Sequence, residues 1–263
     1  MFINHFKFTH HPFEENIDSD LILRDNRLEK SVARLDFLMD HGYFGVVHGR
    51  PGVGKSMILK DFIRRLDPSE YNTIEMQNTN INGAALLRSL VRELGEKPGR
   101  GRDTLYLQIS SRLKCMDKTL ILLIDNAELL EMTAFTDLRL LVGLSPLHKK
   151  PLKIILCGLD EIDRMLRREQ FSDLYDRINI RIPVYPMDEP DTINYIDYRL
   201  KKAGGNSKCI PAEVKTMVYQ YSGGVMRKVN NIMTACFISA ASLNQSIINE
   251  RTVRLAVKEL GMM

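Results

Sequence analysis

Short aliphatic and β-branched runs recur along the first two thirds of the chain, separated by segments whose apolar residues have helical spacing. Runs of the first kind predict buried strands, and apolar residues three and four positions apart predict helices. Strands are expected at residues 43–49, 71–76, 119–125, 152–158 and 178–184. Helices are expected near residues 25–40, 55–66, 83–94, 103–115, 133–142 and 160–176. This alternation predicts an α/β fold with a five-stranded parallel sheet that is flanked by helices.

The strand signal ends after Pro183 and Pro186, and only helical patterns follow. Four amphipathic segments lie near residues 188–202, 211–221, 225–241 and 249–259. Paired glycines separate some of them, as expected of residues that end helices. The pattern predicts two domains: an α/β domain with a short N-terminal extension, residues 1–187, and a small all-helical domain, residues 188–263.

Composition excludes several classes of protein. Of the 263 residues, 44% are hydrophobic and 27% are charged, which is unlike a disordered or fibrous chain. The apolar runs are far shorter than the roughly 18 residues that a membrane span needs, and the N-terminus does not have the pattern of a secretory signal. The four cysteines form no C-x-x-C pair. We therefore expect a cytoplasmic protein with reduced cysteines and no membrane partner.

The net charge of +4 is too small to indicate a nucleic-acid partner by itself, but its distribution is uneven. Residues 191–263 contain 10 basic and 5 acidic side chains, which leaves 27 basic and 28 acidic side chains in the first 190 residues. The helical region therefore carries the positive excess.

The strongest chemical signal is GRPGVGKS, residues 49–56, between an expected strand and an expected helix. It fits G-x-x-x-x-G-K-[ST], in which the backbone N–H groups of a glycine-rich turn surround phosphate oxygens. Lys55 would reach the β- and γ-phosphates, and the Ser56 hydroxyl would bind Mg²⁺. The alternative is a glycine-rich turn that fits by chance. We expect ATP and Mg²⁺ as cofactors, with the nucleotide held by Gly49, Pro51, Gly52, Val53, Gly54, Lys55, Ser56 and Met57.

A second signal is LILLIDNAELL, an apolar strand that ends in Asp125. This carboxylate could bind the Mg²⁺ through water, or it could cap the next helix. Many ATPases have Glu at the following position, but this chain has Asn126, whose amide can position water and cannot take its proton. Glu128 is a weak substitute, two residues further on. We therefore expect slow hydrolysis or a different base.

Several of these motifs together resemble the AAA+ ATPases of the ExeA, TnsC and MuB type, and in pattern the ExeA-like branch most of all. The resemblance covers nearly the whole chain, including HFKFTHHPFEENID, LIDNAELL, IILCGLDEIDRML and YSGGVMRKVNNI. It implies a P-loop AAA+ fold followed by a helical lid, and an ATPase that self-associates. Asn126, Glu128 and Leu159 depart from the family's pattern, and Leu159 puts its sensor-one contact in doubt.

The resemblance also implies roles for two arginines. Arg177 matches the arginine that reaches the γ-phosphate of the neighbouring subunit, with Arg168 and Arg181 as rivals. Its alternative is a surface arginine that pairs with a nearby aspartate, Asp173 or Asp176. Arg227 matches the sensor-two arginine, which contacts the nucleotide from the lid; its alternative is a solvated cation at a helix start.

A DNA contact is expected in GEKPGRGRDT, residues 95–104, which matches a DNA-contacting loop of TnsC-like and MuB-like members. Lys97, Arg100 and Arg102 on a loop rich in glycine suit contacts to phosphates that do not read sequence. A solvated charged loop is the alternative, and residues 78–80 and 148–150 are lesser candidates.

These features favour an ATP-dependent regulator of DNA transposition. It would form a ring or helical filament on double-stranded target DNA and recruit or activate a transposase, with a target-selection protein as a further partner. One alternative is an ExeA-like secretion-assembly ATPase, which is expected less because proteins of that kind continue into a transmembrane helix and a wall-binding domain. Another alternative is a nucleotide-gated scaffold that hardly hydrolyses ATP.

Overall fold

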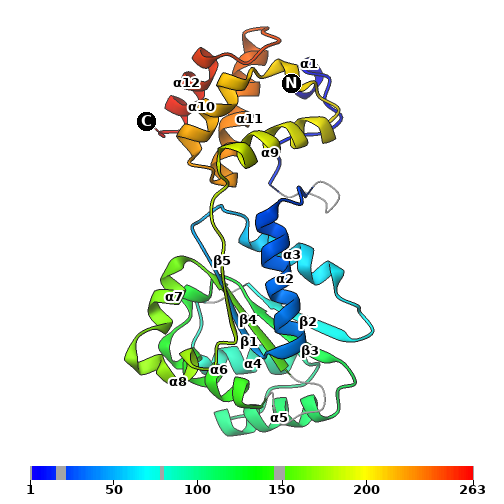
Figure 1. The fold of residues 1–263 in the computed structure, drawn as a ribbon. Helices are drawn as coiled ribbons and strands as arrows, with labels where there is room; N and C mark the ends of the chain where they lie inside the picture. Colours follow the sequence, from blue (N-terminus) through cyan, green and yellow to red (C-terminus); the bar gives the residue numbers. More distant parts are fainter. Residues whose placement is uncertain (1, 16–21, 78–79, 145–151, 263) are drawn as a thin grey trace. The chain divides into compact units, whose positions relative to one another are not determined.

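A five-stranded parallel sheet organises the first part of the molecule (Figure 1). The computed structural model describes residues 2–15, 22–77, 80–144 and 152–262. The strands are β1 (Phe44–His48), β2 (Tyr71–Met76), β3 (Thr119–Ile124), β4 (Leu152–Gly158) and β5 (Ile180–Pro183), in the order β2-β3-β4-β1-β5. The predicted sheet is confirmed, because the first and last residues of each predicted strand lie within two residues of those observed.

Helices cover both faces of this sheet. They are α2 (Asn26–His41), α3 (Lys55–Arg65), α4 (Gly83–Glu93), α5 (Arg102–Lys114), α6 (Met132–Leu144), α7 (Asp160–Leu166) and α8 (Ser172–Tyr175), with short 3₁₀ turns η2 (Ala127–Leu129) and η4 (Glu169–Phe171). The main core joins alternate residues of the strands to α4–α8. On the other face, a Cβ at Gly45 would lie 2.7 Å from a methyl group of Leu38, so glycine lets α2 pack directly on β1.

The helix predicted at residues 160–176 is wrong, because the structure has α7, η4 and α8 there instead. Each residue of an α-helix turns by about 100°. Ile162 and Phe171 would therefore lie on opposite sides of one continuous helix, yet both are buried in the same core. The break after Leu166 turns Phe171 inward, where its ring packs 5.1 Å from that of Phe135. Shared burial thus overrides the local helical pattern.

The second part of the molecule is helical, as predicted. Its elements are α1 (Phe2–His5), α9 (Glu189–Lys202), η5 (Ser207–Cys209), α10 (Ala212–Ser222), α11 (Met226–Ser242) and α12 (Glu250–Glu259). Asp188 accepts the N–H group of Asp191 at the start of α9, and Asn249 accepts that of Thr252 at the start of α12. Such caps satisfy N–H groups that the first helical turn leaves without partners.

Internal contacts divide the chain into two units. One comprises Arg27–Arg50 and Lys55–Val184, and the other comprises Met1–Asn26, Pro51–Gly54 and Tyr185–Met263. The N-terminal segment, which the sequence analysis attached to the α/β domain, thus groups with the helical unit. The reason is aromatic packing, since the rings of Phe2, Phe8 and Phe13 lie 6.3, 5.1 and 6.1 Å from the ring of Phe237 on α11. The division into functional domains at residues 187 and 188 stays a prediction.

Membrane-spanning potential is missing from the helices of the described ranges: none combines the length and the apolar character that crossing a bilayer requires.

Candidate functional site

The glycine-rich loop connects the end of β1 to the start of α3. Gly52 and Gly54 have φ angles of 76° and 105°, a region that disfavours residues with a Cβ. Lys55 Nζ donates hydrogen bonds to the carbonyl oxygens of Gly49 (2.9 Å) and Arg50 (3.1 Å). The lysine ammonium group is thus held over the loop, at the N-terminal end of a helix that favours anions. This arrangement suits a bound phosphate.

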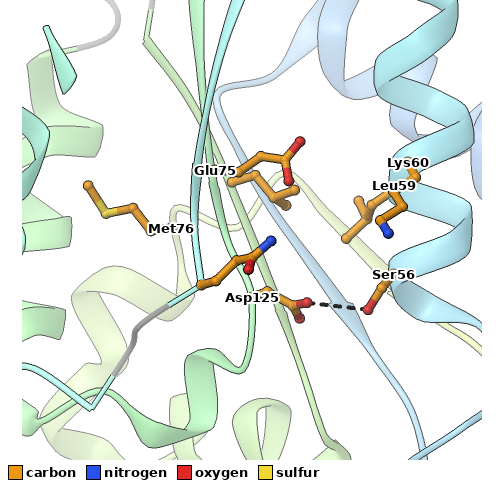
Figure 2. Close-up of a pocket in the computed structure, with 8 residues that line it drawn as sticks. Ser56, Leu59, Lys60, Glu75, Met76 and Asp125 are labelled. Carbon is orange, nitrogen blue, oxygen red and sulfur yellow. Dashed lines mark hydrogen bonds between the residues drawn. The ribbon is translucent and has the colours of Figure 1, made fainter. Parts of the chain in front are cut away.

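Two oxygen-bearing side chains meet beside the loop. Ser56 Oγ, in the first turn of α3, donates to Asp125 Oδ2 at 3.3 Å, just after β3 (Figure 2). A hydroxyl and a carboxylate are hard oxygen ligands of the kind that Mg²⁺ prefers. Within the described ranges, the protein has no group of three or more His, Cys, Asp or Glu residues that could hold a metal ion. A pair of oxygen ligands suits an ion that takes its other ligands from phosphate and water.

A pocket next to this pair contains two charged side chains that the sequence analysis missed. Glu75 on β2 and Lys60 on α3 line it together with Ser56 and Asp125. Figure 2 shows Glu75 on the side of β2 that faces α3, whereas Met76 points to the other side. Strand alternation could have revealed this placement, since Glu75 interrupts an otherwise apolar end of β2.

Asn126 follows Asp125 in a left-handed conformation, with φ 50° and ψ 43°. Its N–H group donates to Asp125 Oδ1 at 2.9 Å, and its side chain is exposed. Asparagine tolerates this backbone conformation better than most residues do. The local turn therefore orients the Asp125 carboxylate with one oxygen on Asn126 and the other on Ser56.

Glu128 and Leu159, two departures from the family pattern, lie in contact. Leu159 N–H donates to Glu128 Oε2 at 3.1 Å, one residue before α7 begins. A Cβ at Gly158 would lie 2.4 Å from the same oxygen, so a larger residue there would displace this carboxylate from its present position. Sequence inspection noted the two residues separately, and only the approach of η2 to the end of β4 brings them together.

Cys157, the residue before Gly158 in β4, is completely buried. Burial, and after it the charge and hydrogen bonding of Asp125, raises the pKa of the Cys157 thiol well above its usual range. The thiol therefore stays protonated and unreactive, as expected of a structural cysteine.

His48 is a further residue that the sequence analysis did not single out. It ends β1 directly before the loop, and its Nδ1 lies 2.8 Å from Asp160 Oδ1 at the start of α7. The two residues are 112 positions apart, so no spacing in the sequence could have revealed the pair. The contact links the residue directly before the glycine-rich loop to α7, the helix that follows β4.

The structure separates the three candidate trans-acting arginines. Arg181 stacks on the Tyr175 ring at 4.0 Å, and its Nε lies 3.6 Å from Asp163 Oδ1, so it is engaged within its own subunit. Arg177 and Arg168 have no hydrogen-bonded or ion-paired side-chain partner in the part of the chain that the structure describes. The aspartate at 173, considered as a partner of Arg177, pairs with Arg139 instead. Both arginines are exposed.

Arg227 is the first residue after Met226 in α11 and lies in the helical unit. Its N–H group donates to Gly52 O at 3.0 Å, a residue that groups with the same unit. Its guanidinium Nε donates to Glu15 Oε1 at 3.0 Å. The solvated helix-start cation considered for Arg227 thus has a specific carboxylate partner.

The basic loop is partly tied to the protein. Arg102 Nη2 lies 3.3 Å from Asp137 Oδ2, a nearly buried carboxylate whose pKa is raised by burial, against the effect of Arg102. Gln108 Nε2 donates to Lys97 O at 3.0 Å. Arg102 is thus engaged by a carboxylate of the protein. Of the lesser candidates, residues 78–79 and 148–150 lie outside the described residues.

Comparison with known proteins gives the site a context. Residues 38–166 match a family model described as an AAA domain. The chain is 26% identical over 267 residues to "General secretion pathway protein A" of Aeromonas hydrophila, an alignment that covers 99% of this chain and 49% of that protein. The chain thus spans about half the length of this relative.

Solved structures show the fold. Cdc6p from Pyrobaculum aerophilum superposes with a TM-score of 0.72 at 17% identity, covering 94% of this chain and 70% of that one. Aeropyrum pernix ORC2, solved as ADPNP–ADP complexes, gives 0.71 at 18% identity, with 95% and 71% covered. Aeropyrum pernix ORC1 in complex with DNA gives 0.66 at 13% identity, with 94% and 67% covered. The chain has a P-loop AAA+ fold.

Proposed function

We propose that the chain is the ATPase module of a secretion-assembly protein of the ExeA-like kind, in which bound ATP controls association between copies. The observation that carries the proposal is the alignment of almost the whole chain with general secretion pathway protein A. The comparisons favour this function over the transposition regulator that the sequence analysis preferred.

In this proposal the loop and Lys55 hold the triphosphate, and Ser56 and Asp125 hold Mg²⁺. When bound, the ion would neutralise the phosphate charge that develops during transfer. Asn126 lies beside Asp125 and would position the attacking water. Hydrolysis is then slow, because an amide cannot accept the proton and because Glu128 is held on the N–H group of Leu159.

The arginines complete the site between copies. Arg177 would contact the γ-phosphate of a neighbouring copy, with Arg168 as its rival, because a cation there stabilises charge in the transition state. Arg227 would contact the nucleotide from the lid. Nucleotide binding and association are then linked, since a triphosphate attracts these cations more strongly than a diphosphate does.

Calorimetry and mass photometry test this proposal together. The full chain should bind ATP with Mg²⁺ at one site, and ATP should increase its oligomeric mass without DNA. Arg177→Ala should keep binding and lose ATP-dependent association, whereas Arg164→Ala, an exposed arginine paired with Glu161, should lose neither. A folded protein that gives no binding heat would refute nucleotide control altogether.

A second candidate function is the DNA-bound regulator of transposition, with double-stranded DNA and a transposase as partners. It draws support from the basic loop and from the likeness in fold to a DNA-bound ORC1. We expect the double substitution Lys97→Ala and Arg100→Ala to weaken ATP-dependent DNA binding about tenfold at low salt. The matched control is Arg112→Ala with Lys114→Ala, two exposed cations on α5. DNA-bound filaments that form with ATP and Mg²⁺ would favour this function over secretion.

A further inference from the structure

Glu15 contacts the arginine to which the proposed function assigns a nucleotide contact. The Nε of Arg227 and Oε1 of Glu15 are 3.0 Å apart, and each side chain is about half exposed, at 58% and 54%. Both residues belong to the helical unit, although they are 212 positions apart in the chain. The contact therefore depends on where the N-terminal segment is held.

A buried set of contacts holds that segment. Arg199 on α9 is only 2% exposed, and its Nη2 donates to the backbone oxygen of Glu14 at 2.8 Å. Its Nη1 donates to the Tyr195 hydroxyl at 2.7 Å, and that hydroxyl donates to Asn230 Oδ1 at 2.8 Å. Asn230 lies on α11, one turn after Arg227. Because buried polar groups are costly to leave without partners, these bonds fix the backbone just before Glu15.

Phe13, the residue before Glu14, holds the segment through an apolar contact. Phe13 is 2% exposed and its ring stacks on that of Phe237, also on α11, with an interplanar angle of 20°. Phe13 is thus attached through its ring to α11, the helix that carries Arg227, and Glu14 is attached through its carbonyl oxygen to α9. The position of Glu15 beside Arg227 follows from this attachment.

The geometry of the pair leaves most of the guanidinium available. A guanidinium has five N–H donors, and Glu15 takes the one on Nε. The four donors on the two terminal nitrogens form the fork that binds phosphate oxygens in pairs. The backbone of Arg227 is held as well, by its bond to Gly52 in the phosphate loop. An arginine fixed at its backbone and at Nε has few remaining orientations.

We propose that Glu15 is a positioning residue for Arg227: it holds the guanidinium through Nε so that the terminal nitrogens are presented to nucleotide phosphate. This inference rests on the proposed function, specifically on the nucleotide contact of Arg227. Preorganisation of this kind lowers the entropy that the side chain loses when the ligand binds. An exposed ion pair contributes little to stability, so the effect lies in binding rather than in folding.

The test compares ATP affinities by titration of the full chain with a fluorescent ATP analogue and Mg²⁺. Glu15→Ala should weaken binding about threefold to fivefold, which is the scale of one exposed charge pair. Glu15→Gln keeps an oxygen that can accept the Nε bond, and it should bind within about twofold of the wild type. Glu14→Ala removes the same charge one residue away and should bind like the wild type. Thermal midpoints measured on all variants should be equal.

An Arg227→Ala background separates positioning from a general structural role. In that background, Glu15→Ala should have no further effect on ATP affinity, because the residue that it positions is missing. An effect that persists there would overturn the inference. Tighter binding by both Glu15 variants would also overturn it, since Glu15 would then compete with phosphate for the arginine.

Failure of the proposed function gives a different result. A wild-type chain that binds no nucleotide would refute nucleotide control and the inference together. A wild-type chain that binds ATP, with an affinity that Arg227→Ala does not change, would overturn only the role of Arg227 and of the glutamate that positions it.

Discussion

Two lysines of the α/β unit each donate to two backbone carbonyl oxygens, at opposite ends of the parallel sheet. Lys55, at the carboxyl ends of the strands, bonds to Gly49 and Arg50 in the glycine-rich loop. Lys153, at the amino end of β4, bonds to Leu38 and Gly42 at the end of α2. Lys153 is 4% exposed, whereas Lys55 is only partly buried. One lysine is enclosed by protein, and the other is partly open to solvent beside the glycine-rich loop.

The same difference extends to the neighbouring polar groups. At the amino ends, Asn179 Oδ1 accepts the N–H groups of Tyr43 and Phe44, so its role is to join β1 to the segment before β5. At the carboxyl ends, Ser56 and Asp125 contact each other and border a pocket. Ligands of parallel α/β sheets bind at the carboxyl ends of the strands. The comparison teaches that polar residues stabilise the fold at one end and remain available for chemistry at the other.

The largest effect is expected from Lys55→Ala. The variant should lose measurable ATP binding and hydrolysis, because the loop loses the cation that reaches the phosphates. Its free energy of unfolding in urea should stay within about 1 kcal/mol of the wild type, since water can replace the lost hydrogen bonds at this partly exposed site. Calorimetry and urea titration measure the two quantities. A much larger loss in the free energy of unfolding would mean that Lys55, like Lys153, mainly stabilises the fold.

Asp125→Asn should separate binding from hydrolysis. We expect ATP to bind with an affinity close to that of the wild type, while phosphate release falls about a hundredfold because the metal ligand loses its charge. The measurement is steady-state phosphate release over a range of Mg²⁺ concentrations. A rate restored by high Mg²⁺ supports a metal role, and an unchanged rate at low Mg²⁺ would count against it.

Lys153→Met tests the amino end. Burial lowers the pKa of Lys153 to about 8 from its usual 10.5. Between these values the unfolded chain binds more protons than the folded one, so the wild-type free energy of unfolding should rise with pH. Compared with the variant, the free energy of unfolding of the wild type should increase by about 3 kcal/mol between pH 8 and pH 10.5. Below pH 8 it should not change, because Lys153 is protonated in both the folded and the unfolded chain. Urea titrations across this pH range measure the free energies of unfolding. A difference between wild type and variant that does not change with pH would refute the lowered pKa of Lys153.

Asn126→Glu should raise ATP turnover about tenfold or more, because a carboxylate beside Asp125 can accept the proton of the attacking water. ATP affinity should change little. The assay is phosphate release at saturating ATP. An unchanged turnover would mean that proton transfer to a base does not limit the wild-type rate.

Glu128→Gln should have the smallest effect, with turnover within about threefold of the wild type. The amide oxygen can still accept the N–H group of Leu159, and the carboxylate is not expected to act as the base. The same phosphate-release assay applies. A loss of a hundredfold would instead identify Glu128 as the catalytic base and would explain why Asn126 is tolerated.

Much of the fold was predictable because its signals are local. β3 is buried at every position, and its continuous apolar run was read as a strand of a parallel sheet. The loop from Gly49 to Ser56 was predicted from the spacing of its residues and from the strand and helix expected on either side of it, and all of these signals are local. The prediction of one helix over residues 160–176 was wrong for the opposite reason. Whether this segment forms one helix or the three elements α7, η4 and α8 depends on the contact between Phe171 and Phe135, which no local pattern contains.

By itself, the sequence determined the places of the five strands and indicated the glycine-rich loop and the carboxylate at 125, because these features follow from the periodicity and chemistry of adjacent residues. Only the tertiary structure decided which side chains meet across the chain. It paired Glu128 with Leu159, His48 with Asp160, and Arg227 with Glu15, at separations of 31, 112 and 212 residues. Such pairs form where packing brings distant segments together, and packing depends on the buried surfaces of the whole unit rather than on any one segment.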